Sequence, residues 1–71
     1  MLNKKTFTSK LAANIKRVRE SKSISQEELA DKAGIYRTYI GHVENGRYSP
    51  SAFIVYKIAQ ALKVKIAELL P

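Results

Sequence analysis

Apolar residues recur every three or four positions along most of the chain, and no segment shows sustained alternation of apolar and polar residues. Leu11, Ile15 and Val18 have this spacing, and residues 55–62 repeat it. Such spacing puts the apolar side chains on one side of an α-helix, whereas a half-buried strand needs strict alternation. The pattern therefore predicts an all-α fold.

The chain has 71 residues, the size of one small domain, so we expect a single domain over residues 1–71. A domain of this size has a marginal core and commonly adds disulfides, a metal or a second subunit. Cysteine is absent and His42 is the one histidine, which excludes disulfides and argues against a metal site. A second subunit remains as the means of added stability.

Five helices are predicted, over residues 8–22, 26–33, 36–45, 50–62 and 65–70. Ser25 and Glu28 have the spacing of a capping box, in which the serine hydroxyl accepts a hydrogen bond from the Glu28 amide and the Glu28 side chain accepts one from the Ser25 amide. Thr8 or Ser9 is expected to cap the first helix and Ser49 the fourth, since hydroxyl side chains are favoured there. The predicted helices are therefore short and have defined starting points.

The predicted helices over 26–33 and 36–45 are joined by a short turn that contains Gly34. The second of them has two clear core residues, Ile40 and Val43. Two short helices joined in this way form a helix-turn-helix pattern. A helix with so few anchors leaves most of its surface free, and the major groove of B-DNA admits one α-helix. The pattern therefore favours binding to double-stranded DNA.

The formal net charge is +7, and seven of the thirteen basic residues lie within positions 1–22, which contain one acidic residue. This balance favours a polyanionic partner, either nucleic acid or an anionic membrane surface. No apolar run approaches the roughly 20 residues that a membrane span needs. The N-terminal sequence lacks the apolar stretch of a secretory signal. We therefore expect a cytoplasmic protein. Binding to a membrane surface through residues 8–22 is the least favoured alternative, because the apolar face of that helix is needed for the core.

A close family resemblance is carried by SQEELADKAGI at 25–35, TYI at 38–40, VENGR at 43–47, SPS at 49–51 and IAQAL at 58–62. These segments resemble the XRE family, the Cro/repressor-type helix-turn-helix class of phage and bacterial regulators, over about residues 9–70. RTYI at 37–40 is similar to the restriction–modification controller proteins, which are short members of the family. The resemblance implies a five-helix, lambda-repressor-like DNA-binding domain with its helix-turn-helix motif at about 26–45.

The same resemblance implies a bacterial or phage-encoded regulator of transcription. Such a protein would bind a palindromic operator in double-stranded DNA as a homodimer, with RNA polymerase as a further partner if it activates. We expect no cofactor. We also expect no small-molecule ligand, because the chain has no second domain to hold one.

Family positions that read base edges correspond to Tyr36, Arg37, Thr38 and His42. Positions implied to hold phosphates correspond to Gln26, Tyr39, Asn45, Arg47, Tyr48 and Ser49. The amides at a helix N-terminus, such as that at Gln26, attract anions in any case. Arg19 and Glu44 match a pair that forms an internal salt bridge in many relatives. Tyr36 stands where many relatives have a capping serine or aspartate, which leaves the exact start of that helix open.

Residues 50–62 carry more apolar side chains than one face of a helix can bury. A wide apolar stripe means burial on two sides, and exposed apolar surface on a small protein marks an interface. We therefore expect the helices over 50–70 to form a two-fold dimer interface through Phe53, Ile54, Tyr56 and Leu70. The alternative is a thicker local core.

Two other classes of function compete with DNA binding. An enzyme is not expected, because one histidine, no cysteine and no glycine-rich phosphate loop leave too few catalytic groups. A protein-interaction adaptor, similar to an antitoxin and using the apolar face of residues 50–62, remains an alternative.

Overall fold

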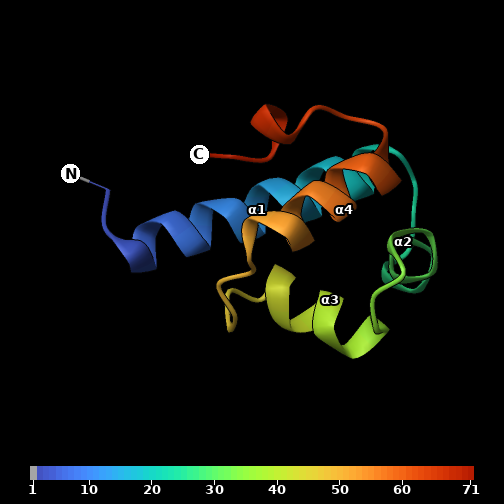
Figure 1. Ribbon diagram of the computed structural model, residues 1–71, viewed down its shortest axis with the longest axis horizontal. Coiled ribbons are helices and arrows are strands. Elements are labelled where there is room, and N and C mark those ends of the chain that lie inside the picture. Colours follow the sequence, from blue (N-terminus) through green and yellow to red (C-terminus); the bar gives the residue numbers. More distant parts are fainter. Residues whose placement is uncertain (1) are drawn as a thin grey trace.

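A computed structural model describes residues 2–71. It contains four α-helices and one turn of 3-10 helix, namely α1 (Lys4–Ser21), α2 (Gln26–Ala33), α3 (Arg37–Glu44), α4 (Ala52–Leu62) and η1 (Ile66–Glu68). In Figure 1, α3 lies on one side of α1 and α4, and the C-terminal segment returns along the other side. The described residues contain no strand, so the prediction of an all-α fold is confirmed.

The fifth predicted helix is wrong, because residues 65–70 form only the single 3-10 turn η1. Six residues make fewer than two helical turns, too few to offset the cost of starting a helix. Tertiary contacts fix this segment instead. Leu69 is fully buried, and its carbonyl oxygen accepts a hydrogen bond of 2.9 Å from the side-chain amide of Asn14 on α1.

Helix α1 begins four residues earlier than predicted. Its cap is Asn3, whose side-chain oxygen accepts a hydrogen bond of 2.8 Å from the Thr6 amide. Thr8, one of the two expected caps, is instead a buried residue inside the helix. The extra turn also carries Phe7, which packs against the core and supplies the apolar contact that holds this turn in place.

The N-terminal caps of α2 and α4 were both predicted, and the structure places the cap of α4 at a different serine. The Ser25 hydroxyl accepts a hydrogen bond of 3.0 Å from the Glu28 amide, which is one half of the predicted capping box; the return bond from the Ser25 amide to the Glu28 side chain does not form. Helix α4 is capped by Ser51 rather than Ser49, with its hydroxyl 3.2 Å from the Ile54 amide. Because Pro50 follows Ser49, that serine is biased towards extended backbone, and the helix starts after the next hydroxyl.

The core is built from all four α-helices together with the segment after η1. Its buried members are Leu11, Ile15, Val18, Leu29, Ala30, Ile40, Val43, Val55, Ile58, Ala59, Leu62 and Leu69. Every inward stripe predicted from helical spacing contributes to this set. Helix α3 contributes just two of these side chains, so most of its surface lies outside the core. None of the described helices is long and apolar enough to cross a membrane.

Candidate nucleic-acid interface

The turn between α2 and α3 is set by Gly34. This residue has φ 68°, a left-handed conformation that glycine adopts without the penalty of a Cβ atom. The Ile35 amide then donates a hydrogen bond of 3.0 Å to the Ala30 carbonyl, which closes the end of α2. Two fully buried side chains, Ile40 and Val43, seat α3 against the core. The helix-turn-helix arrangement expected from the sequence is therefore present.

The first turn of α3 is open to solvent. Tyr36 is 87% exposed, and Arg37 and Thr38 are also exposed. Tyr36 occupies the N-cap position without a side-chain cap hydrogen bond, so α3 begins at Arg37. The first amides of a helix have no partner within that helix. The uncapped start therefore presents free backbone donors beside a cation, a hydroxyl and a phenol.

An aromatic contact ties the loop after α3 to the helix itself. The Tyr48 ring lies with its centroid 5.4 Å from that of Tyr39 and 5.0 Å from that of His42. Tyr39 and His42 are consequently only partly exposed, and Tyr39 also packs against the core. Of the loop residues assigned to phosphate contacts, Asn45, Arg47, Tyr48 and Ser49 are all exposed. The loop is therefore packed against α3 through Tyr48, with the other three side chains assigned to phosphate exposed beside it.

A buried ion pair fixes α3 to α1. Arg19 donates from Nε to Oε2 of Glu44 over 2.6 Å and from Nη2 to Oε1 over 3.0 Å. The Glu44 side chain is 1% exposed and that of Arg19 is 10% exposed. This hydrogen bonding with Glu44 raises the pKa of Arg19, against the opposing effect of burial. Arg19 also donates to the Ile24 carbonyl over 2.7 Å, so the pair braces the chain between α1 and α2.

Gln26 joins the same network. Its side-chain amide donates a hydrogen bond of 3.1 Å to Oε1 of Glu44, which connects the start of α2 to the end of α3. The sequence does not predict this contact, since the expected role of Gln26 was to hold a phosphate. No spacing rule signals it, because the two residues are 18 positions apart and only the fold brings them together. The amides at the start of α2 are separate from this side-chain contact.

The residues expected at a dimer interface lie elsewhere in the fold. Phe53 is 66%, Tyr56 49% and Leu70 41% exposed, on α4 and in the chain after η1. Ile54 is partly buried and packs against the core, as the alternative of a thicker local core predicts for that one position. Lys57 Nζ lies 5.5 Å from the centroid of the Phe53 ring.

Comparisons with known proteins agree with this arrangement. The sequence profile of the helix-turn-helix family HTH_3 matches residues 15–69. An uncharacterised HTH-type transcriptional regulator of Sinorhizobium fredii is 36% identical over 59 residues, covering 83% of this chain and 77% of that protein. Control protein C.SmaI of Serratia marcescens is 37% identical over 60 residues, covering 84% of this chain and 71% of that protein.

A solved structure shows the same fold. The restriction-modification controller protein C.AhdI of Aeromonas hydrophila superposes with a TM-score of 0.87 at 35% sequence identity, covering 89% of this chain and 96% of that one. The chain therefore belongs to the XRE-type helix-turn-helix family of DNA-binding transcriptional regulators, and it is not an enzyme.

Proposed function

We propose that the protein recognises a specific sequence in double-stranded DNA as a homodimer, with α3 inserted in the major groove of each half of a palindromic operator. The observation that carries this proposal is the exposed first turn of α3. The side chains of Tyr36, Arg37 and Thr38 are exposed to solvent. The opposite side of α3 is fixed to the core by Ile40 and Val43 and to α1 by the Arg19–Glu44 ion pair. A rigid helix with a free polar face suits base readout.

Within this proposal, Arg37, Thr38, Tyr36 and His42 read base edges. Arginine can form two hydrogen bonds with the O6 and N7 atoms of guanine, which makes Arg37 the main determinant of sequence preference. The residues proposed to bind phosphates lie at the start of α2, on α3 and in the loop after it, namely Gln26, Tyr39, Asn45, Arg47, Tyr48 and Ser49. For Gln26, the anion is held by the free amides at the start of α2, because the side chain is already bonded to Glu44.

The dimer interface is proposed to contain Phe53, Tyr56 and Leu70, with Ile54 at its inner edge. Phe53, Tyr56 and Leu70 are all exposed, and Phe53 and Tyr56 lie one turn apart on α4. Adjoining exposed apolar side chains are the kind of surface that a second subunit covers. A second copy of this chain is the partner proposed to cover these side chains, because a dimer also matches the symmetry of a palindromic operator. A two-fold dimer presents two copies of α3, and half-sites about 34 Å apart fall on one turn of the duplex.

The subclass that we propose is a restriction–modification controller or a similar phage-type regulator. This assignment is supported by the controller proteins of Serratia and Aeromonas, which are similar to most of this chain. Contact with RNA polymerase belongs to this proposal if the protein activates.

The direct test is selection of bound sequences from a pool of random duplex DNA at physiological salt with the purified protein. Enrichment of a palindromic motif with half-sites about one helical turn apart is expected. Enrichment of a single, non-repeated half-site would contradict the dimer. Recovery of no motif would overturn the proposed function and leave only non-specific attraction between a basic protein and DNA.

Phe53→Ala is expected to shift the protein from dimer towards monomer. Each dimer would contain two copies of the truncation, and buried aromatic anchors commonly contribute about 2 kcal/mol or more to an interface. Sedimentation velocity over a concentration series measures the shift. Tyr36→Ala is the matched control, since it removes an even more exposed aromatic ring from the start of α3. An unchanged dimer in Phe53→Ala, or an equal shift in Tyr36→Ala, would contradict this interface.

The exposed Phe53 face also supports the second candidate, a protein-interaction adaptor that uses α4. In that case, the face would bind a different protein and α3 would carry no function. Arg37→Ala separates the two candidates because it leaves α4 intact. Loss of operator binding supports the regulator, whereas full retention of cellular function supports the adaptor.

A further inference from the structure

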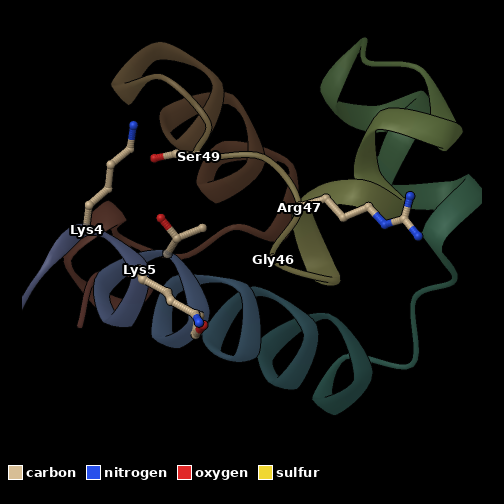
Figure 2. Close-up of a pocket in the computed structure, with 7 residues that line it drawn as sticks. Lys4, Lys5, Gly46, Arg47 and Ser49 are labelled. Atoms are coloured by element: carbon tan, nitrogen blue, oxygen red, sulfur yellow. The ribbon is translucent and has the colours of Figure 1, made fainter.

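A basic pocket extends the surface assigned to DNA so far, because Arg47 and Ser49 line it together with residues of α1 that have no assigned role. It is formed where the first turns of α1 meet the loop between α3 and α4, and Lys4, Lys5, Thr8, Arg47 and Ser49 are among its lining residues. Figure 2 shows Lys4 and Ser49 pointing towards one another across the pocket, while the side chains of Lys5 and Arg47 extend in other directions. We call this site the α1–loop pocket.

The lining of the α1–loop pocket is suited to an anion. None of its lining residues is acidic, and hydroxyl groups of Thr8, Ser9 and Ser49 accompany the two lysines. Thr8 is more than nine-tenths buried, so its position at the pocket wall is fixed by packing. The Lys4 ammonium group and the hydroxyls supply several hydrogen-bond donors and positive charge, the combination that binds phosphate oxygens, and Lys5 adds a second positive charge nearby.

The position of the two lysines gives an independent reason to expect an anion. Both lie in the first turn of α1, which contains no acidic residue. Positive side chains at a helix N-terminus oppose the helix dipole, and acidic residues are the favourable choice there. Lys4 and Lys5 therefore cost the helix stability in the free protein. A bound anion would cancel this unfavourable interaction.

We infer that the α1–loop pocket binds a phosphate of the operator backbone, next to the segment that α3 reads. This inference rests on the proposed function, because it requires that α3 face the duplex. The loop from Gly46 to Ser49 directly follows α3, so one wall of the pocket is continuous with the proposed interface. The other wall precedes residue 15, where the family match begins. The pocket thus adds a contact that the matched region alone does not contain.

The first test compares the salt dependence of operator binding in two double variants. Lys4→Gln with Lys5→Gln removes the lysines of the pocket. Lys10→Gln with Lys63→Gln removes the same charge from exposed residues that do not line it. For each phosphate that a protomer no longer neutralises, the slope of log K against log salt is expected to flatten by about 0.9 in the pocket variant. The control variant is expected to keep the slope of the unaltered protein.

Charge reversal separates binding from folding. Lys4→Glu with Lys5→Glu places acidic residues at the start of α1, where they favour the helix dipole. The melting temperature is therefore expected to stay level or rise, while operator affinity falls below that of the glutamine variant. Thermal unfolding followed by circular dichroism and titration of the operator give the two readouts. Operator affinity equal to that of the unaltered protein would overturn the inference.

Phosphate ethylation of the operator locates the contact. With the unaltered protein, ethylation of a phosphate adjoining the segment read by α3 is expected to block binding, and the Lys4→Gln, Lys5→Gln variant should lose that sensitivity. Equal slopes in both double variants, or an unchanged ethylation pattern, would overturn the pocket assignment while specific binding still supports the proposed function. If the unaltered protein selects no sequence, the proposed function fails and this inference fails with it.

Discussion

Arg19→Met is expected to leave the protein largely unfolded at 25 °C. Removing one member of a buried ion pair costs about 3–5 kcal/mol, because the other charge stays in the interior without its partner. A core in a chain this short rarely supplies more than about 3–5 kcal/mol in total. Methionine keeps much of the arginine volume, so the loss reports the charge rather than a cavity. Far-UV circular dichroism and urea unfolding measure it.

The cost is high because Glu44 has no route to water. Its side chain is 1% exposed, and without Arg19 its one remaining side-chain partner is the amide of Gln26. Arg17→Met is the matched control, since Arg17 is an exposed arginine two positions away on the same helix. Exposed substitutions of this kind usually change stability by about 0.5 kcal/mol or less.

A second variant shows that the unpaired charge is responsible. Arg19→Met combined with Glu44→Leu removes both charges, and replacing a buried ion pair by apolar residues is often close to neutral. The double variant is therefore expected to recover most of the stability that Arg19→Met loses. If Arg19→Met is as stable as Arg17→Met, the pair is not a structural element and Arg19 becomes available for a role on DNA. A double variant as unstable as the single one would assign the loss to the Ile24 contact instead.

Much of this fold follows from local signals in the sequence. Ser25 starts α2 and Gly34 ends it through interactions that span three to five residues, so spacing alone predicts them. The buried stripes of α1 and α4 follow from helical periodicity in the same way. Ile40 and Val43 were identifiable as the anchors of α3 because few other apolar residues lie in that segment.

The features that were missed depend on contacts between distant segments. The early start of α1 relies on Asn3 together with the packing of Phe7 against the core. The last segment forms a 3-10 turn because Leu69 is drawn into the core and bonded to Asn14. Neither contact produces a periodic pattern in the sequence from which it could be predicted.

In the candidate site, too, the parts set by local sequence could be predicted and the parts set by contacts between distant segments could not. The exposed residues of α3 could be chosen from their separation from the apolar stripe. The α1–loop pocket could not, because it joins positions about forty residues apart. The one sequence signal for this pocket was the concentration of lysine and arginine before residue 23. It predicts an anionic partner but does not show where on the fold the anion binds. The individual DNA-contact roles stay predictions until binding is measured.

Arg37→Ala is expected to weaken operator binding by about 1–3 kcal/mol for each half-site, or roughly 5- to 150-fold, and to relax the preference at one base pair. The reason is geometric. An arginine in the first turn of α3 can donate two hydrogen bonds to a guanine edge, and alanine donates none. Binding to the selected operator and to operators changed at each position, at fixed salt, measures both effects. Because Arg37 is exposed, its replacement should leave the unfolding free energy within about 0.5 kcal/mol of the original.

Arg47→Ala is the comparison that separates recognition of bases from binding to phosphates. Arg47 is an exposed arginine in the loop after α3, where a phosphate contact depends on charge rather than on sequence. Its loss is expected to weaken all duplexes alike and to flatten the salt slope by about one unit for each protomer. Arg37→Ala should instead change the ranking of operators more than the slope. If the two variants alter ranking and slope equally, α3 does not read bases through Arg37, and specificity must come from the shape of the DNA or from another residue of the helix.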